Sequence, residues 1–436
     1  MNLFALRRER FLEKMGPEAV AILPTNPVRN RSNDVDFRFR PDTDFYYLTG
    51  FPEPESVAIL DPKAEGGPLT LVVRPRDPER EVWNGRRAGV DGARAKHGAH
   101  RAAPTAELQA ELARAIANKE RVYYRLGRQP ELDQLVLETI RKIAAQNRTG
   151  LSAPTTIVDP CEILADLRLY KTGEELELAR RAAAISSEGH LAAMRAVRPG
   201  MHEYEIEALV EYTFRRSGSP SPGYPSIVGS GPNTCILHYH ENDRRMEDGD
   251  LLLVDAGAEW ECFSGDITRT YPVNGKFTRE QAEIYQIVLD AQLAAIAAVR
   301  PGNCFQAIHD TAVRVLAEGL IRVGLIEGPL ARALEAETYR KYYMHKTSHW
   351  LGMDVHDAGK YRVKGEWRKL APGMVLTVEP GLYIGEFAPD APAKYRNIGV
   401  RIEDDVLVTE SGCEVLTAAV PKTVVDIERE LARRPA

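Results

Sequence analysis

Apolar runs and polar stretches alternate along roughly the first 150 residues of the chain. Short aliphatic and β-branched runs at Ala19–Leu23, Ser56–Leu60 and Leu69–Val73 are typical of buried strands. Longer segments with apolar positions three and four residues apart, at Leu108–Ile116 and Leu132–Ile143, predict helices. Because strands and helices alternate, we expect a small α/β domain here.

A loop and a capped helix mark the passage to a second domain. The segment Ala153-Pro-Thr-Thr-Ile-Val-Asp-Pro160 is rich in proline and threonine, which predicts a hinge. Thr172-Gly-Glu-Glu175 has the spacing of a capping box, and helical periodicity follows from Leu176 to Ala193. Since 436 residues exceed the usual size of one hydrophobic core, we expect two domains, at residues 1–160 and 161–436.

The second domain contains an internal repeat. Ala196-Val-Arg-Pro-Gly200 recurs as Ala298-Val-Arg-Pro-Gly302, and each copy follows an alanine-rich helical segment and precedes another helix. Identical residues in the same context favour duplication over coincidence. Two related halves would face each other across a pseudo-two-fold axis.

Carboxylates stand at the ends of apolar strands in this second domain. Leu251–Val254 is an apolar run that ends at Asp255, and Val375–Val378 ends in the same way at Glu379. Asp266 follows 11 residues after Asp255, a spacing that fits a hairpin with the two carboxylates close together. Rigid strands hold ligands better than loops do, so this pattern favours a metal site.

The acidic set is completed by residues further along the chain. Alternation after Val400 places Arg401 and Glu403 on one strand face. Any single acid is most simply a salt-bridged surface residue, but several buried carboxylates together require a neutralising cation. The predicted ligand set is Asp255, Asp266, His349, Glu379 and Glu403. Oxygen ligands with one nitrogen favour two Mn²⁺ ions, with Co²⁺, Fe²⁺ or Zn²⁺ able to substitute.

Composition narrows the functional classes. A net charge of −6 argues against nucleic acid or an acidic membrane as partner. The chain has no apolar run of about 18 residues and no signal-peptide pattern at its start, so we expect no membrane span and no secretion. Its five cysteines lack Cys-x-x-Cys spacing, which is typical of reduced thiols in a cytoplasmic protein.

One alternative metal motif is excluded. His345 and His349 are four residues apart, as in the zinc-protease motif His-Glu-x-x-His. Lys346 occupies the position where that motif requires glutamate, so the motif is absent.

The motifs around these ligands resemble a known family. The segments Asn233–Tyr239, Thr347–Asp357 and Thr377–Tyr383, together with Arg40–Phe51 in the first domain, are similar to those of the pita-bread metallopeptidases. Within that family the chain most resembles the Xaa-Pro aminopeptidases. The resemblance implies an α+β protein, with a C-terminal pita-bread fold of duplicated α/β halves behind a smaller α/β domain. Lys346 departs from the family, which usually has glycine there.

The resemblance also implies roles for residues around the ligands. His238 would stabilise the developing oxyanion, His356 would contact the substrate beyond the scissile bond, and His345 would line the proline pocket. A hydrogen-bonded structural histidine is the alternative for each. Glu379 would also carry a proton to the leaving nitrogen.

Three further residues are candidates for substrate binding. Asp34 matches the family segment that reaches the substrate's free amine, although a surface aspartate is an equal alternative. Tyr383 would donate near the substrate, or belong to the core. Arg401 would orient a ligand carboxylate or neutralise the acidic cluster.

The implied activity is that of a metal-dependent exopeptidase. A metal-bridging hydroxide would release the N-terminal residue from peptides with proline in the second position. Related enzymes combine subunits, so we expect a homo-oligomer, a dimer or a tetramer. The alternatives are a prolidase, which cleaves only Xaa-Pro dipeptides, and a non-catalytic peptide-binding module on the same fold.

Overall fold

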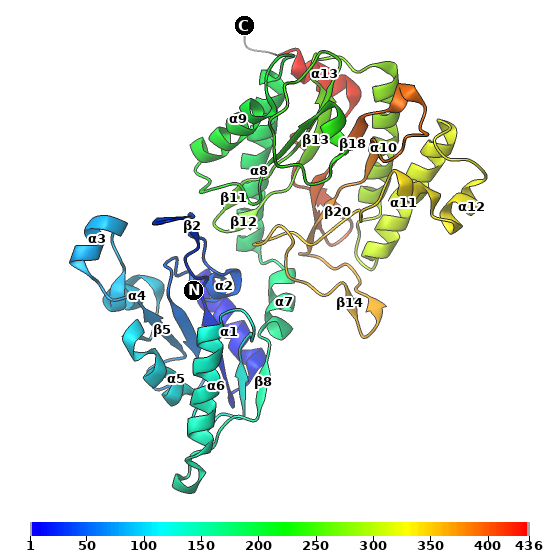
Figure 1. Ribbon diagram of the computed structural model, residues 1–436. Helices are drawn as coiled ribbons and strands as arrows, with labels where there is room; N and C mark the ends of the chain where they lie inside the picture. Colours follow the sequence, from blue (N-terminus) through cyan, green and yellow to red (C-terminus); the bar gives the residue numbers. More distant parts are fainter. Residues whose placement is uncertain (1, 434–436) are drawn as a thin grey trace. The chain divides into compact units, whose positions relative to one another are not determined.

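Two units follow one another along the chain (Figure 1). The computed structural model describes residues 2–433. The first unit ends at Leu167 and the second starts at Arg168, so helix α7 (Cys161–Leu169) spans the boundary. Among the described residues, none of the helices combines the length and apolar character that crossing a membrane requires.

The first unit is built on a six-stranded sheet with the strand order β6-β5-β4-β1-β7-β8. Its helices are α1 (Leu3–Met15), α2 (Thr43–Thr49), α3 (Pro78–Asn84), α4 (Gly89–His97), α5 (Leu108–Ile116) and α6 (Pro130–Ala144). Its strands are β1 (Ala19–Pro24), β2 (Asn30–Ser32), β3 (Val35–Asp36), β4 (Val57–Leu60), β5 (Leu69–Val73), β6 (Arg101–Pro104), β7 (Arg121–Tyr123) and β8 (Thr156–Val158). The three predicted strands and two predicted helices are confirmed, because each coincides with one of these elements within a few residues.

The predicted hinge is partly wrong. Residues Thr156–Val158 form β8, which pairs in parallel with β7 at the edge of the sheet. Three consecutive β-branched side chains favour a strand, and this preference prevails over the prolines on either side.

The second unit carries two longer helix pairs and several short sheets. Its helices are α8 (Gly173–Ala196), α9 (Glu203–Arg216), α10 (Arg279–Ala297), α11 (Phe305–Arg322), α12 (Leu330–Glu335) and α13 (Val424–Leu431). Its strands are β9 (Ile227–Ser230), β10 (Leu251–Asp255), β11 (Glu259–Trp260), β12 (Phe263–Ser264), β13 (Thr268–Pro272), β14 (Arg362–Val363), β15 (Glu366–Trp367), β16 (Val375–Val378), β17 (Gly381–Ile384), β18 (Ile398–Arg401), β19 (Asp404–Val408) and β20 (Cys413–Val415).

The element order in this unit repeats. Helix α8 begins with a capping box at Thr172 and Glu175, and α10 begins with one at Thr278 and Gln281. Each helix is followed by a copy of Ala-Val-Arg-Pro-Gly and then by a second helix, α9 or α11. The sheet β13-β10-β9 follows the first helix pair, and the sheets β16-β19-β20 and β17-β18 follow the second.

Strands of the two halves meet in the middle of the unit. The Glu403 amide donates to the Thr268 carbonyl at 3.0 Å, and the Arg401 amide donates to Thr270 Oγ1 at 3.2 Å. These bonds join β13 of the first half to the segment of β18 and β19 in the second. The acidic residues predicted at strand ends therefore lie at a junction that neither half could form alone.

Candidate metal centre

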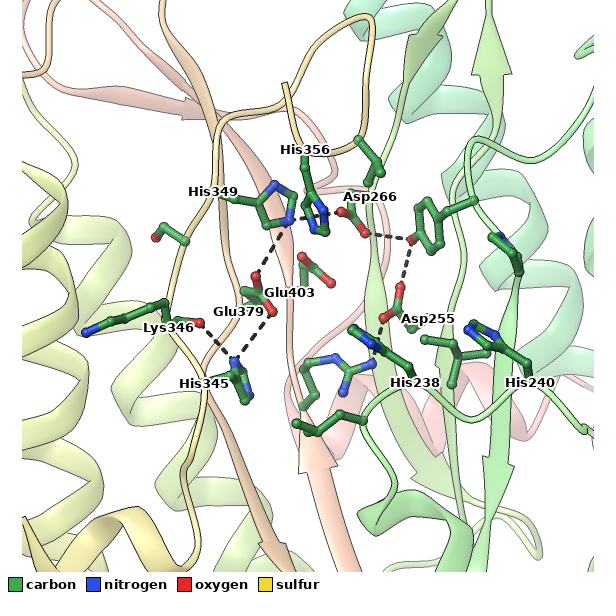
Figure 2. Close-up of a pocket in the computed structure, with 17 residues that line it drawn as sticks. His238, His240, Asp255, Asp266, His345, Lys346, His349, His356, Glu379 and Glu403 are labelled. Atoms are coloured by element: carbon green, nitrogen blue, oxygen red, sulfur yellow. Dashed lines mark hydrogen bonds and ion pairs between the residues drawn. The ribbon is translucent and has the colours of Figure 1, made fainter. Parts of the chain in front are cut away.

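A pocket of about 420 Å³ lies at the junction of the two halves (Figure 2). It is lined by nine of the residues that the sequence singled out: His238, Asp255, Asp266, His345, His349, His356, Glu379, Arg401 and Glu403. His240, which carried no expected role, also lines it. Both halves of the second unit therefore contribute to one cavity.

Strand pairing places the two aspartates. Asp255 is the last residue of β10 and lies opposite Thr268 of β13, while Asp266 stands two residues before Thr268. The short β11–β12 hairpin fills the connection between them. Asp255 thus reaches the pocket from the end of β10 and Asp266 from the residues just before β13, the strand paired with it, so the two carboxylates lie close together as the spacing predicted.

In the second half, a pair of extended segments carries the predicted ligands His349 and Glu379 into the pocket. The Thr377 amide donates to the His349 carbonyl at 3.0 Å, and the Glu379 amide donates to the Thr347 carbonyl at 2.8 Å. This pairing fixes the His349 segment against β16, so that His349 and Glu379 approach the same space. His349 Nε2 lies 3.6 Å from Glu379 Oε1.

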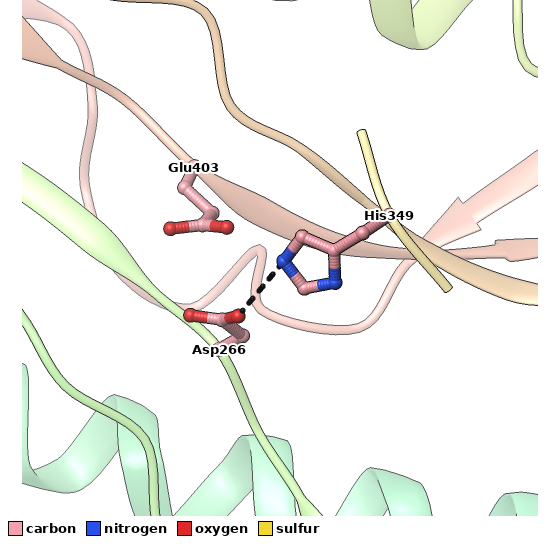
Figure 3. Close-up of side chains that lie close together, drawn as sticks. All are labelled: Asp266, His349 and Glu403. Carbon is pink, nitrogen blue, oxygen red and sulfur yellow. Dashed lines mark ion pairs between the residues drawn. The ribbon is translucent and has the colours of Figure 1, made fainter. Parts of the chain in front are cut away.

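Three of the five predicted ligands converge most closely (Figure 3). One donor atom each from Asp266, His349 and Glu403 lies within 4.8 Å of the other two. His349 Nε2 is 3.3 Å from Asp266 Oδ2. Asp255 and Glu379 stand outside this tight group but line the same pocket.

The tautomer of His349 suits a ligand. Its Nδ1 lies 3.0 Å from the Trp350 carbonyl oxygen, which can only accept, so Nδ1 carries the hydrogen. Nε2 is then the atom directed at Asp266. A carbonyl on the far nitrogen is the usual arrangement for a metal-binding histidine.

The acids of the pocket lack sufficient positive charge. Burial and the neighbouring carboxylates raise the pKa of Glu403 well above its usual range, and burial raises that of Asp266. Burial likewise raises the pKa of Glu379 to about 7. Arg401 donates to Asp255 Oδ2 at 2.6 Å, whereas Glu403 Oε2 accepts from the neutral Thr268 hydroxyl, at 2.6 Å. Crowded, hard oxygen donors with one imidazole therefore fit a divalent cation.

His345 is held differently from the other histidines. Its Nδ1 lies 2.8 Å from the Lys346 carbonyl and its Nε2 lies 2.9 Å from Tyr383 Oη. Burial and Arg401 lower the pKa of His345 to about 3. A neutral ring that donates to a carbonyl and accepts from a phenol has both nitrogens occupied, so His345 contributes shape to the pocket wall.

His238 and His356 are exposed side chains that line the pocket. The His356 ring meets the His349 ring edge to face, with centroids 4.5 Å apart. Burial and His349 lower the pKa of His356, so its ring is neutral at pH 7. Both histidines are accessible to a bound molecule.

The remaining predicted residues lie in different surroundings. Tyr383 reaches the site from behind the pocket wall, where its hydroxyl accepts from Arg401 Nη1 at 3.1 Å. Arg401 Nε also donates to Thr268 Oγ1 at 3.1 Å, which fixes the guanidinium among the acids. Asp34 is exposed in the turn between β2 and β3 of the first unit, and its role stays a prediction.

Sequence reasoning missed two contacts of the acidic residues. The Tyr224 hydroxyl lies 2.7 Å from Asp255 Oδ1 and 2.6 Å from Asp266 Oδ1. Thr268 bonds both Glu403 and Arg401. Thr268 stands in the Asp-Ile-Thr-Arg motif and could have been suspected, but Tyr224 lies in a Ser-Pro-Gly-rich loop without any such signal.

Comparison with known proteins identifies the family. The model of metallopeptidase family M24 matches residues 177–410, and that of the aminopeptidase P N-terminal domain matches residues 4–123. The chain belongs to metallopeptidase family M24. The Xaa-Pro aminopeptidase of Escherichia coli is 43% identical over 98% of this chain and 96% of its own length. Human Xaa-Pro aminopeptidase 3 is 33% identical over 98% of this chain and 85% of its own length.

Solved structures of the family share the fold. Aminopeptidase PepP of Pseudomonas aeruginosa matches with a TM-score of 0.96 at 48% identity, covering 98% of this chain and 97% of that one. Zinc-substituted E. coli aminopeptidase P in complex with product matches with a TM-score of 0.95 at 42% identity, covering 100% and 99%. The expected resemblance, the pita-bread fold class and the class of metal-dependent peptidase are confirmed.

Proposed function

We propose that the protein is a dinuclear metallo-aminopeptidase that releases the N-terminal residue from peptides with proline in the second position. The observation that carries this proposal is the convergence of undercompensated carboxylates and one imidazole on a pocket of about 420 Å³. Relatives named Xaa-Pro aminopeptidase, which match nearly the whole chain, support the substrate class.

The proposed ligands are the five predicted residues, Asp255, Asp266, His349, Glu379 and Glu403. Two Mn²⁺ ions suit this oxygen-rich set best, and Co²⁺, Fe²⁺ or Zn²⁺ can replace them. When bound, such ions polarise a carbonyl and lower the pKa of water, which supplies a nucleophile at neutral pH. The excess of buried acid favours occupancy, because cations remove the repulsion among the carboxylates.

Glu379 is the residue placed to move a proton. It follows β16 directly, and its Oε2 lies 3.8 Å from His345 Nδ1 while its Oε1 faces His349. A carboxylate held on both sides in this way can take a proton on one oxygen and pass it to the leaving proline nitrogen. Without that proton the nitrogen would have to leave as a strongly basic amide anion, so protonation is essential for its departure.

The exposed histidines contact the substrate. His238 is exposed where it lines the pocket and donates to the oxyanion that develops on the attacked carbonyl. His356, beside His349, contacts the residue beyond the scissile bond. His345 forms the wall against which the proline ring packs, and Tyr383 and Arg401 hold that wall and Asp255 in place.

The first domain, residues 1–160, is assigned a part in substrate selection and assembly. An aspartate such as Asp34 would attract the free ammonium of the peptide, which restricts cleavage to N-termini. We place the catalytic domain at residues 161–436. A homo-oligomer in the cytoplasm is the proposed state.

The test is product analysis by mass spectrometry. Metal-depleted protein is given an Xaa-Pro-Yaa tripeptide and an Xaa-Pro dipeptide, with and without added Mn²⁺. Release of free Xaa from the tripeptide only when Mn²⁺ is present is the expected result. A tripeptide with alanine in place of proline serves as the control and should remain intact.

Other outcomes separate the alternatives. Cleavage of the dipeptide alone would make the protein a prolidase. Binding of Mn²⁺ without cleavage of either peptide would contradict the proposal and favour a peptide-binding module.

A further inference from the structure

We propose that Tyr224 is a positioning residue of the metal centre. Its single hydroxyl bridges Asp255 Oδ1 at 2.7 Å and Asp266 Oδ1 at 2.6 Å, and so sets the orientation of both carboxylates. The inference rests on the proposed function in one respect, namely that these two acids hold divalent ions. Tyr224 lies outside the sequence motifs that carry the predicted ligands in the two halves of the repeat.

Asp255 is hydrogen-bonded at both of its oxygens, whereas Asp266 is hydrogen-bonded at Oδ1 and lies beside an imidazole nitrogen at Oδ2. Asp255 Oδ2 accepts from Arg401 at 2.6 Å, and Asp266 Oδ2 lies 3.3 Å from His349 Nε2. A carboxylate with one partner can rotate about its last torsion, which is broad, whereas one with a partner on each oxygen cannot. Tyr224 supplies the second contact for both acids, so its loss would free two carboxylates at once.

The Tyr224 hydroxyl is one donor placed between two acceptors, the Oδ1 atoms of Asp255 and Asp266. A phenol has one hydrogen, which it can share between two carboxylate oxygens or direct to either. The hydroxyl therefore spaces two like charges that would otherwise separate. Fixed spacing matters for a metal centre, because ligands must stand within a few tenths of an ångström of their working positions.

Tyr224 is itself rigidly placed by its neighbours. The Gly223 amide donates to the Gly257 carbonyl at 2.9 Å, and the Glu259 amide donates to the Ser221 carbonyl at 3.1 Å. The loop before Tyr224 is thus bonded to the segment that links Asp255 to Asp266. A side chain at Gly223 would bring its Cβ within 2.5 Å of Ser264 Oγ, so the approach is close.

The flank that follows Tyr224 is fixed as well. Asn242 Oδ1 accepts from the Val228 amide at 2.9 Å, and Asn242 Nδ2 donates to the Ser226 carbonyl at 2.9 Å. With backbone bonds on both sides, the phenol has little freedom to follow the aspartates if they move.

The experiment compares Tyr224→Phe with Tyr271→Phe. Tyr271 lies on β13, is fully buried, and its hydroxyl has no hydrogen-bond partner within residues 2–433, so its removal controls for the loss of a buried phenol oxygen. Each protein is stripped of metal and titrated with Mn²⁺ by calorimetry, without peptide. Tyr224→Phe should raise the Mn²⁺ dissociation constant by about 10- to 100-fold, the usual effect of removing a group that orients metal ligands. Tyr271→Phe should leave it unchanged.

A spectroscopic readout separates positioning from general destabilisation. The visible absorption bands of the Co²⁺-loaded protein report ligand geometry, and they should change in Tyr224→Phe but not in Tyr271→Phe. Thermal unfolding of the metal-free variants checks that both remain folded. Wild-type affinity and an unaltered Co²⁺ spectrum in Tyr224→Phe would overturn the inference, as would equal losses in both variants.

The same titration distinguishes this inference from the proposed function. Should wild-type protein bind no Mn²⁺ or Co²⁺, the proposed function fails and the inference fails with it. Should wild type and Tyr224→Phe bind metal equally well, only the role of Tyr224 is lost.

Discussion

Glu403 and Asp404 are adjacent in the chain and equally buried, yet their surroundings are opposite. Asp404 accepts from Arg269 at 2.7 Å, Lys422 at 2.6 Å and Gln292 at 2.7 Å. Burial alone would raise the pKa of Asp404, but Arg269 and Lys422 outweigh it and hold that pKa below its usual range. Glu403 faces carboxylates instead, and its pKa is raised.

The difference distinguishes two uses of a buried acid. Asp404 is compensated within the fold, and its charge ties β19 to Arg269 of β13. Within residues 2–433, Glu403 forms no ion pair of its own: the nearby Arg401 pairs with Asp255, and burial and the neighbouring carboxylates outweigh its effect on Glu403. The charge of Glu403 is therefore a cost to folding that an added cation can remove. A carboxylate that the protein leaves uncompensated is a better guide to a metal site than a carboxylate that is merely buried.

The largest expected effect comes from neutralising the uncompensated acid. Glu403→Gln should lower kcat/KM by a thousandfold or more, on the order of the several kcal/mol that metal ions contribute to such reactions. The metal-free variant should melt at the same temperature as wild type or higher, because one repelling charge is gone. Peptide turnover and calorimetric melting measure the two effects. A marked loss of stability without metal would contradict the comparison.

The compensated acid should behave in the opposite way. Asp404→Ala leaves Arg269 and Lys422 beside each other without a counter-charge, and Arg269 is fully buried. We expect a loss of about 3–5 kcal/mol in the free energy of unfolding, the usual result of removing one partner of a buried pair. Urea denaturation of the metal-free protein measures it. Metal-free Glu403→Gln is the matched control, since it alters the neighbouring residue.

Asp357 is a second compensated acid, and the stability that it provides should depend on pH. Its carboxylate is buried between Arg168, at 2.5 Å, and Lys171, at 3.1 Å, which lower its pKa although burial opposes them. A lowered pKa means that the stabilisation is present above the unfolded value, about 3.9, and is lost as pH falls through the lower folded value. Asp357→Asn should therefore cost about 1–3 kcal/mol at pH 6.

The cost of Asp357→Asn should shrink as pH falls below about 4, because wild type then loses the same charge. Denaturation curves of both proteins between pH 6 and pH 3 give the difference. A gap that stays constant over this range would show that shape, and not charge, makes Asp357 important.

Much of the architecture was predictable from local patterns. The apolar runs that end at Asp255 and Glu379 became β10 and the strand β16 before Glu379, because such runs have few alternatives once a polar residue ends them. The capping box at Thr172 marked the start of α8. These features depend on residues that are close together in the chain, so they can be read from the sequence directly.

What could not be predicted depends on contacts between distant segments. Glu403 and Asp404 look alike in the sequence, and only the packing of Arg269 and Lys422, from other parts of the chain, separates them. Tyr224 lies in a loop 31 positions before Asp255 in the chain, yet its hydroxyl contacts both Asp255 and Asp266. The hinge was misread because three β-branched residues extended the sheet of the first unit.

The junction of the two halves has a further consequence. Asp255 and Glu403 are 148 positions apart, so a cation that engages both acts as a removable cross-link across most of the second unit. By the chain-entropy account, a link that closes a loop of this length restricts the unfolded chain by about 5 kcal/mol. The concentration of divalent cations around the protein would then govern its lifetime in the folded state as well as its rate of catalysis.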